Sequence, residues 1–239
     1  MQIDTIGETG STNADLAARL LAGESLTEGY WLVTDRQTSG RGRNGRNWLN
    51  APGNFMGSTV AQLRLDDPPP VNLSMVAALA VLESAQRCVS DPSRLRLKWP
   101  NDVLLDGAKF CGILLERVKN HAVVGIGVNL AAAPEIAGRE TRALAALGPA
   151  PQRDTFASEL ATAFAGELAR WRNEGRDELH RRWLAAAHPL GTPLAVHDEQ
   201  GATVTGRFAG LAEDGALILR LDDGGQRVIH AGDVTEEKA

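Results

Sequence analysis

The chain has 239 residues, of which 43% are hydrophobic and 23% charged, and its formal net charge is −5. This length suits one large domain with a smaller one, and the negative charge argues against nucleic acid as the main partner, because domains that bind phosphate backbones are usually strongly basic. No apolar run is long enough to cross a membrane, and residues 1–12 lack the basic start of a signal peptide. The two cysteines, Cys88 and Cys111, form no metal-binding pair. We therefore expect a cytoplasmic protein with reduced thiols.

Apolar periodicity predicts three helices and a set of strands in the first 190 residues. Thr12 and Asp15 stand at capping-box spacing, which indicates a helix over residues 13–22. Further helical patterns cover residues 71–89 and 153–187, the latter with Asp154 as its N-cap. Strands are expected over residues 30–34, 55–65, 95–99, 103–105, 108–118 and 123–130, followed by a loop over 131–152.

From Gly191 onward the sequence changes to short β-type runs separated by glycine turns. These runs cover residues 193–197, 201–208, 215–221 and 226–230, a pattern typical of a small β-barrel or sandwich. We therefore predict an α+β fold: a mixed or antiparallel β-sheet backed by helices in residues 1–190, and a small all-β domain in residues 191–239.

Residues 40–48, GRGRNGRNW, interleave three arginines with three glycines. Glycine lets the backbone approach a ligand closely, and arginine presents a planar fork of donors to carboxylate or phosphate. The segment therefore predicts a loop that closes over an anionic ligand; the alternative is an ordinary solvated basic loop. Residues 40–45 also match the dinucleotide pattern GxGxxG, but Asn50, Pro52 and Gly53 leave no room for the helix that such a site requires.

An Asp106-Gly107 pair between two apolar runs predicts a tight hairpin, and its two-residue turn fixes the register. Leu104 then pairs with Lys109, and Asp102 falls on the same face, about 7–8 Å from Lys109 across a diagonal. A carboxylate and an ammonium so placed form a candidate site, the alternative being a surface ion pair of little value. Only four of the 25 basic residues are lysines, which makes Lys109 more informative.

Residues 125–129 read Gly-Ile-Gly-Val-Asn. Two glycines inside a strand mark either a bulge or a place where a ligand lies against the backbone. Asn129, which follows them, could bind a phosphate or a metal-bound water.

In their order along the chain, these motifs resemble the biotin protein ligase family. The matching segments are residues 11–13, 37–48, 98–102, 109–114, 125–129 and 215–219. The resemblance covers almost the whole chain and implies the family's class II aminoacyl-tRNA synthetase-like catalytic fold, followed by an SH3-like C-terminal domain. Some members carry an N-terminal DNA-binding domain; because the chain begins shortly before Ser11, we expect the form without it and no DNA binding.

The resemblance implies a ligase that forms C–N bonds. It would use ATP, with Mg²⁺, to convert biotin to biotinyl-5′-AMP and pyrophosphate, and would then transfer biotin to a lysine of the biotin carboxyl carrier domain of acetyl-CoA carboxylase or a related carboxylase. The resemblance is also compatible with a homodimer of this chain.

Two alternatives remain open. A lipoate or octanoate ligase or transferase would share the fold but lack the Gly-Arg-Gly-Arg loop. A non-enzymatic binding module would need a strongly basic surface and more aromatic residues than the one Tyr and five Phe of this chain.

The resemblance also assigns roles to residues. Lys109 would bridge the biotin carboxylate and the α-phosphate, Arg43 would contact the same region, and Asp102 would either orient Lys109 or accept a proton from the carrier lysine. The biotin-binding residues would be Ser11, Thr12, Asn13, Gln37, Gly40, Arg41, Arg43, Trp99, Lys109, Gly112 and Gly125. The ATP-binding residues would be Arg43, Arg46, Trp48, Asn101, Lys109 and Asn129. No direct protein ligand for Mg²⁺ is expected. Phe110 and Cys111 are bulky, so the sequence does not decide which residues form the wall of the biotin pocket.

Overall fold

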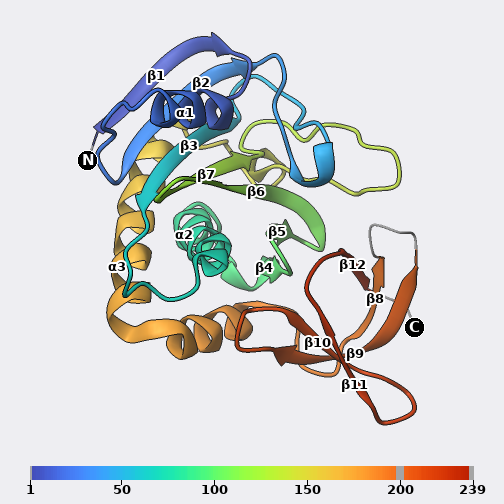
Figure 1. Cartoon of the computed structure of the whole chain (residues 1–239). Helices are drawn as coiled ribbons and strands as arrows, with labels where there is room; N and C mark the ends of the chain where they lie inside the picture. Colours follow the sequence, from blue (N-terminus) through green and yellow to red (C-terminus); the bar gives the residue numbers. More distant parts are fainter. Residues whose placement is uncertain (1, 198–201, 237–239) are drawn as a thin grey trace.

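Seven strands form the sheet at the centre of the larger, N-terminal part of the molecule (Figure 1). They are β1 (Gln2–Thr9), β2 (Tyr30–Gln37), β3 (Phe55–Gln62), β4 (Leu95–Lys98), β5 (Asp102–Leu105), β6 (Ala108–Val118) and β7 (His121–Val128). The computed structural model describes residues 2–197 and 202–236. The strand order is β1-β2-β3-β7-β6-β5-β4, in which β1 and β2 are parallel and the other neighbours antiparallel. The predicted mixed sheet is therefore confirmed.

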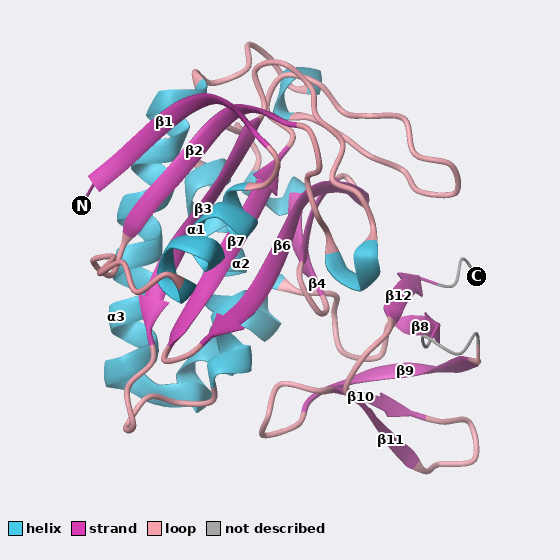
Figure 2. Cartoon of the chain, turned by 45° about the horizontal axis from the view of Figure 1, so that its top comes forward, coloured by secondary structure: helices cyan, strands magenta, loops and turns pink. Residues whose placement is uncertain are grey.

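Three α-helices cover the two faces of this sheet. They are α1 (Thr12–Leu21), α2 (Leu73–Gln86) and α3 (Arg153–Ala186). α2 and α3 pack on one face and α1 on the other, which Figure 2 shows from a second direction. The short 3₁₀ helices η1 (Arg43–Gly45), η2 (Pro70–Asn72), η3 (Pro92–Arg94) and η4 (Leu144–Ala146) lie in the connections. No helix in the described ranges is both long and apolar enough to cross a membrane.

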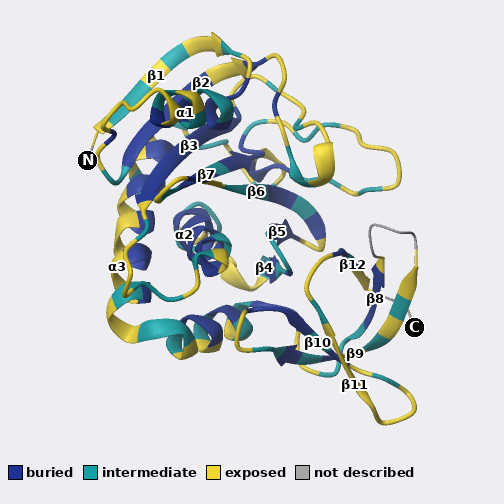
Figure 3. Cartoon of the chain, in the orientation of Figure 1, coloured by how far each residue is buried: buried dark blue, intermediate teal, exposed yellow. Residues whose placement is uncertain are grey.

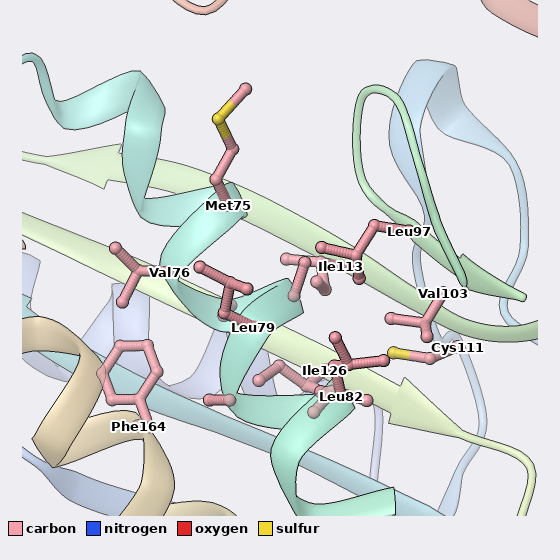
Figure 4. Packing of buried hydrophobic residues seen from close by; sticks show 14 of the residues in the cluster. Met75, Val76, Leu79, Leu82, Leu97, Val103, Cys111, Ile113, Ile126 and Phe164 are labelled. Atoms are coloured by element: carbon pink, nitrogen blue, oxygen red, sulfur yellow. The ribbon is translucent and has the colours of Figure 1, made fainter. Parts of the chain in front are cut away.

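The main core lies between the sheet and the α2–α3 pair. α2 is buried along almost its whole length (Figure 3), which explains why its sequence is apolar on nearly every side. Figure 4 shows Leu79 and Leu82 of α2 close to Ile113 of β6 and Ile126 of β7. This face of the sheet is therefore filled by α2 and α3.

The hairpin between β5 and β6 has the predicted register, with Leu104 opposite Lys109. A bulge then shifts the pairing, so that Asp102 lies opposite Gly112. Phe110 and Cys111, within the bulge, are both fully buried in the main core. Neither side chain therefore extends onto the α1 face.

The C-terminal part is a five-stranded antiparallel sheet in the order β11-β10-β9-β8-β12. Its strands are β8 (Pro193–His197), β9 (Thr203–Leu211), β10 (Leu217–Arg220), β11 (Gln226–Ile229) and β12 (Asp233–Glu236). This confirms the predicted small all-β unit, although β12 was not predicted. The expected strand over 201–208 begins at a residue outside the described ranges.

Both predicted helix caps are wrong. Ser11 is the N-cap of α1, and the hydroxyl of Thr12 instead contacts Gln37 and Ser58. Gln152 is the N-cap of α3, while the Asp154 carboxylate pairs with a neighbouring arginine. For Thr12 buried partners elsewhere in the chain outweigh the local capping preference, whereas Asp154 lies within the first turn of α3.

The long helix α3 is kinked at Gly175, where φ is +81°. Replacing Gly175 with alanine forces a side chain into the left-handed region and is expected to destabilise the fold by about 1–2 kcal/mol. The matched change Gly166→Ala lies in regular helix with no atom within 4 Å of the new Cβ, and should stabilise the fold by about 0.5–1 kcal/mol. Urea unfolding of both variants measures this difference. Effects of the same sign would contradict the kink at Gly175.

Candidate active site

A pocket of about 660 Å³ opens on the α1 face of the sheet. β6 and β7 form its floor, and the start of α1, the loop after β2 and the loop after β7 form its walls. Asp233 of the C-terminal sheet also reaches it. This volume is typical of sites that enclose a small organic molecule.

Glycines make the floor of the pocket. Gly112 and Gly127 are paired across β6 and β7, and the indole of Trp48 covers both of them. A Cβ on Gly112 would lie 2.9 Å from this indole, and one on Gly127 would overlap it. Gly125 makes room in the same way for the Asn13 side chain. These glycines therefore mark close approach to the backbone, and the approaching groups are protein side chains where the sequence had predicted a ligand or a bulge.

Lys109 and Asp102 form an ion pair in the pocket wall. The Lys109 Nζ lies 2.6 Å from the Asp102 Oδ1, and the two side chains are 15% and 11% exposed. The Lys109 backbone is held separately: its N–H donates to the Glu140 carbonyl, and its own carbonyl accepts from the Arg142 N–H, both at 2.9 Å. Lys109 is thus fixed at both its backbone and its ammonium, and it contacts Asp102 directly.

The arginine loop folds back on itself beside this pair. Gly42 N–H donates to the Arg46 carbonyl at 2.7 Å, and Trp48 N–H donates to the Gly40 carbonyl at 2.9 Å. The Arg43 guanidinium donates to Asn101 Oδ1 at 3.2 Å. Gly40 does not line the pocket; a Cβ there would lie 2.9 Å from the Trp48 carbonyl, so Gly40 serves the closure of the loop.

Asp233 of β12 is a pocket residue that sequence reasoning missed. It forms an ion pair with Arg46, and Arg139 also lies within ion-pair distance of it at 3.8 Å. Burial alone would raise the pKa of Asp233. The hydrogen bond from Arg46 and the charges of Arg46, Arg139 and Arg43 outweigh burial, so the pKa lies below its ordinary value. The C-terminal unit therefore supplies a charged anchor for the arginine loop.

Uncharged polar side chains gather at the α1 end of the pocket. Gln37 Oε1 accepts from the Thr12 N–H at 2.9 Å, and the Thr12 and Ser58 hydroxyl oxygens are 2.7 Å apart. Ser58 also donates to Asn13 Oδ1 at 2.7 Å. Ser58 is fully buried and was not predicted, because a lone serine in a strand carries no distinguishing pattern.

The neighbouring Asn54 fixes the orientation of the Asn129 side-chain amide. Asn54 Oδ1 accepts from the N–H groups of Ala131 and Ala132, so Asn54 Nδ2 is the atom that faces Asn129. That NH₂ group can only donate, so it meets the Asn129 oxygen, at 3.3 Å. The Asn129 NH₂ group is left for the pocket, where it can donate to an anion.

Trp99, which was predicted to bind biotin, does not line the pocket. It is buried in the main core, and its indole N–H donates to the Gly215 carbonyl of the C-terminal unit at 3.0 Å. Apart from Trp99 and Gly40, every residue predicted for the site lines this pocket.

Comparison with known proteins gives the same assignment for both parts of the chain. A model of the biotin/lipoate A/B protein ligase family matches residues 9–130, and a model of the biotin protein ligase C-terminal domain matches residues 193–235. The chain is 37% identical over 238 residues to the biotin–[acetyl-CoA-carboxylase] ligase of Mycobacterium tuberculosis, covering 98% of this chain and 88% of that protein. The chain belongs to the biotin protein ligase family.

Two further comparisons agree with this family membership. The biotin–[acetyl-CoA-carboxylase] ligase of Paracoccus denitrificans is 38% identical, with 96% of this chain and 98% of that protein aligned. The structure of a biotin protein ligase from Aquifex aeolicus in complex with biotin and ATP superimposes with a TM-score of 0.85 at 26% identity, and covers 99% of both chains.

The packing of Trp48 on the glycine floor can be tested with one methyl group. In Gly127→Ala the new Cβ displaces the indole, which should loosen the arginine loop and speed tryptic cleavage after Arg41, Arg43 or Arg46 by about tenfold or more. Gly7→Ala, where nothing lies within 4 Å of a new Cβ, is the control and should match the unmodified protein. An unchanged cleavage pattern in Gly127→Ala would contradict this packing.

Proposed function

We propose that this chain activates biotin with ATP and then transfers it to a lysine of a biotin carboxyl carrier domain. The observation that carries the proposal is the polarity of one pocket. Its α1 end offers uncharged hydrogen-bonding groups for a neutral ring, and its other end gathers cations around the Lys109–Asp102 pair. The names of the two relatives and of the similar structure support the same substrates.

The first half-reaction must bring two anions together. An oxygen of the biotin carboxylate attacks the α-phosphorus, the bond from that phosphorus to the bridging oxygen breaks, and pyrophosphate leaves. Lys109 is placed to lie between the carboxylate and the α-phosphate, where its charge offsets their repulsion. Arg43 adds a second positive charge on the loop side. Asp102 keeps the Lys109 ammonium in place during this step.

In the second half-reaction the neutral amine of the carrier lysine attacks the acyl carbon of biotinyl-5′-AMP. The bond from that carbon to the phosphate oxygen breaks, and AMP leaves with the electron pair. The amine loses a proton as the amide forms, and Asp102 is the carboxylate in the pocket wall that lies beside the reacting groups. Asp102 thus serves as the orienting group first and as the proton acceptor second.

The arginine loop acts as the lid over the intermediate. Trp48 covers the floor, and Arg46, Arg139 and the Asn129 amide face the region assigned to the phosphates. A closed lid excludes water, which would otherwise hydrolyse the mixed anhydride.

Mg²⁺ is proposed to enter with the triphosphate and to screen its charge there. Within the described residues no three His, Cys, Asp or Glu side chains gather as a metal site, and the side chains facing the phosphate region are mainly cationic and amide donors. These groups fit the phosphates themselves. The acceptor is proposed to be the carrier domain of acetyl-CoA carboxylase or a related carboxylase, encountered in the cytoplasm.

The substrate assignment is tested by pyrophosphate release from ATP with biotin or with lipoate, each with and without an apo carrier domain. We expect release with biotin alone, and biotin on the carrier lysine when the carrier is present. Release with lipoate and not with biotin would overturn the proposal in favour of the lipoate alternative. Absence of release with either acid would overturn the assignment as an activating ligase.

The roles of Lys109 and Arg43 predict different defects. Lys109→Ala should lower the rate of adenylate formation by about 10²–10³-fold, because it removes the charge between the two reacting anions. Arg43→Ala should form the adenylate but retain it poorly, so that free biotinyl-5′-AMP accumulates in solution. Single-turnover assays with quenched samples measure both quantities. The exposed Arg220→Ala is the charge-matched control; full pyrophosphate release by Lys109→Ala would contradict the role of Lys109.

A further inference from the structure

A chain of hydrogen bonds runs from the half-buried Glu116 on β6 into the pocket. Asn13 Nδ2 donates to Glu116 Oε2 at 2.6 Å, Ser58 Oγ donates to Asn13 Oδ1 at 2.7 Å, and Ser58 Oγ lies 2.7 Å from Thr12 Oγ1. Asn13, Ser58 and Thr12 all line the pocket and are buried, whereas Glu116 does not line it. The hydrogen bond to Asn13 therefore connects Glu116 with the pocket.

The carboxylate at one end sets the direction of this chain. An ionised Glu116 can only accept, so the Asn13 atom that meets it must be the NH₂ group. The Asn13 oxygen then faces Ser58, and the Ser58 hydroxyl donates its single proton in a hydrogen bond to that oxygen. Ser58 can consequently only accept from Thr12, whose single proton has two acceptors within reach, Ser58 Oγ at 2.7 Å and Gln37 Oε1 at 3.2 Å. Each of these groups is left with oxygen lone pairs.

The floor of the sheet keeps the Asn13 side chain in this place. Its Oδ1 rests against Gly125, where any Cβ would collide with it. Glu116 and Gly112 are both even-numbered positions of β6, and Gly112 lies in the pocket floor. The pocket floor at Gly112 and the carboxylate that orients Asn13 are thus parts of one strand.

We propose that Glu116 is a positioning residue that makes this end of the pocket accept hydrogen bonds, so that it selects a ring carrying N–H donors. This inference rests on the proposed function, in which the ring is the ureido group of biotin with its two N–H groups. Without Glu116, the Asn13 amide is free to turn over and present its NH₂ group to Ser58. The wall would then offer a donor where the ring also has a donor.

The test compares biotin-dependent exchange of pyrophosphate into ATP in the full chain and three variants. Glu116→Ala should raise the KM for biotin by roughly tenfold, with the KM for ATP and the thermal midpoint little changed, because a mispaired buried polar group weakens binding. Glu116→Gln should recover most of the affinity, since its amide oxygen can still accept from Asn13. Glu83→Ala, a glutamate on the far helix α2, is the matched control.

Two further measurements separate positioning from a general structural effect. Biotin methylated on one ureido nitrogen lacks an N–H donor, so the preference for biotin over this analogue should shrink in Glu116→Ala. In an Asn13→Ala background, adding Glu116→Ala should cause little further loss, because Glu116 acts through Asn13.

The outcomes distinguish this inference from the proposed function. If the unmodified chain exchanges pyrophosphate with biotin and Glu116→Ala has the same KM and the same analogue preference, the positioning role is wrong. Equal losses in Glu116→Ala and Glu116→Gln would also overturn it, since an acceptor alone would not then suffice. If the unmodified chain shows no biotin-dependent exchange, the proposed function fails and the inference fails with it.

Discussion

The site depends on positions in two neighbouring strands that carry no side chain. Gly112 and Gly127 face each other across β6 and β7, while Phe110 and Ile126 fill the opposite face against the main core. The sheet cannot move away to accommodate a larger residue, because a packed core has few voids. The absent side chains therefore create the floor on which Trp48 lies, and the ion pair and the arginine loop are arranged around its edges.

Much of the fold could be predicted because it rests on local chemistry. The Asp106-Gly107 turn fixed the register that brings Lys109 and Asp102 to one face. The helical pattern over residues 71–89 predicted α2, which is buried along almost its whole length. The edge strands β1 and β12 were missed because neither carries an alternating apolar pattern: β1 has no fully buried residue, and β12 has only Val234. The capping role assigned to Thr12 failed because its buried hydroxyl contacts Gln37 and Ser58, which are distant in the sequence.

Residues of the site could be predicted only where they stand together in a sequence motif. Lys109, Asp102 and the arginine loop stand in distinctive patterns, whereas Ser58 and Asp233 are single polar residues whose role comes from tertiary contacts. Trp99 shows the opposite error, since its place in a motif suggested a pocket wall while its indole lies in the core and binds the C-terminal unit. A motif identifies which segment matters, but the strand geometry decides which face each side chain takes.

Net charge and local charge have different consequences in this protein. A chain of net charge −5 is a poor partner for long polyanions, yet five cationic side chains line the pocket against the two carboxylates of Asp102 and Asp233. Clefts with low-dielectric walls focus such a local excess, so small anions are drawn to the pocket although the surface as a whole repels them. Asp233 also reduces the mutual repulsion of Arg46 and Arg139. Without a carboxylate from the C-terminal unit, the like charges of the lid and of the loop after β7 would push each other apart, so the second unit contributes directly to the shape of the site.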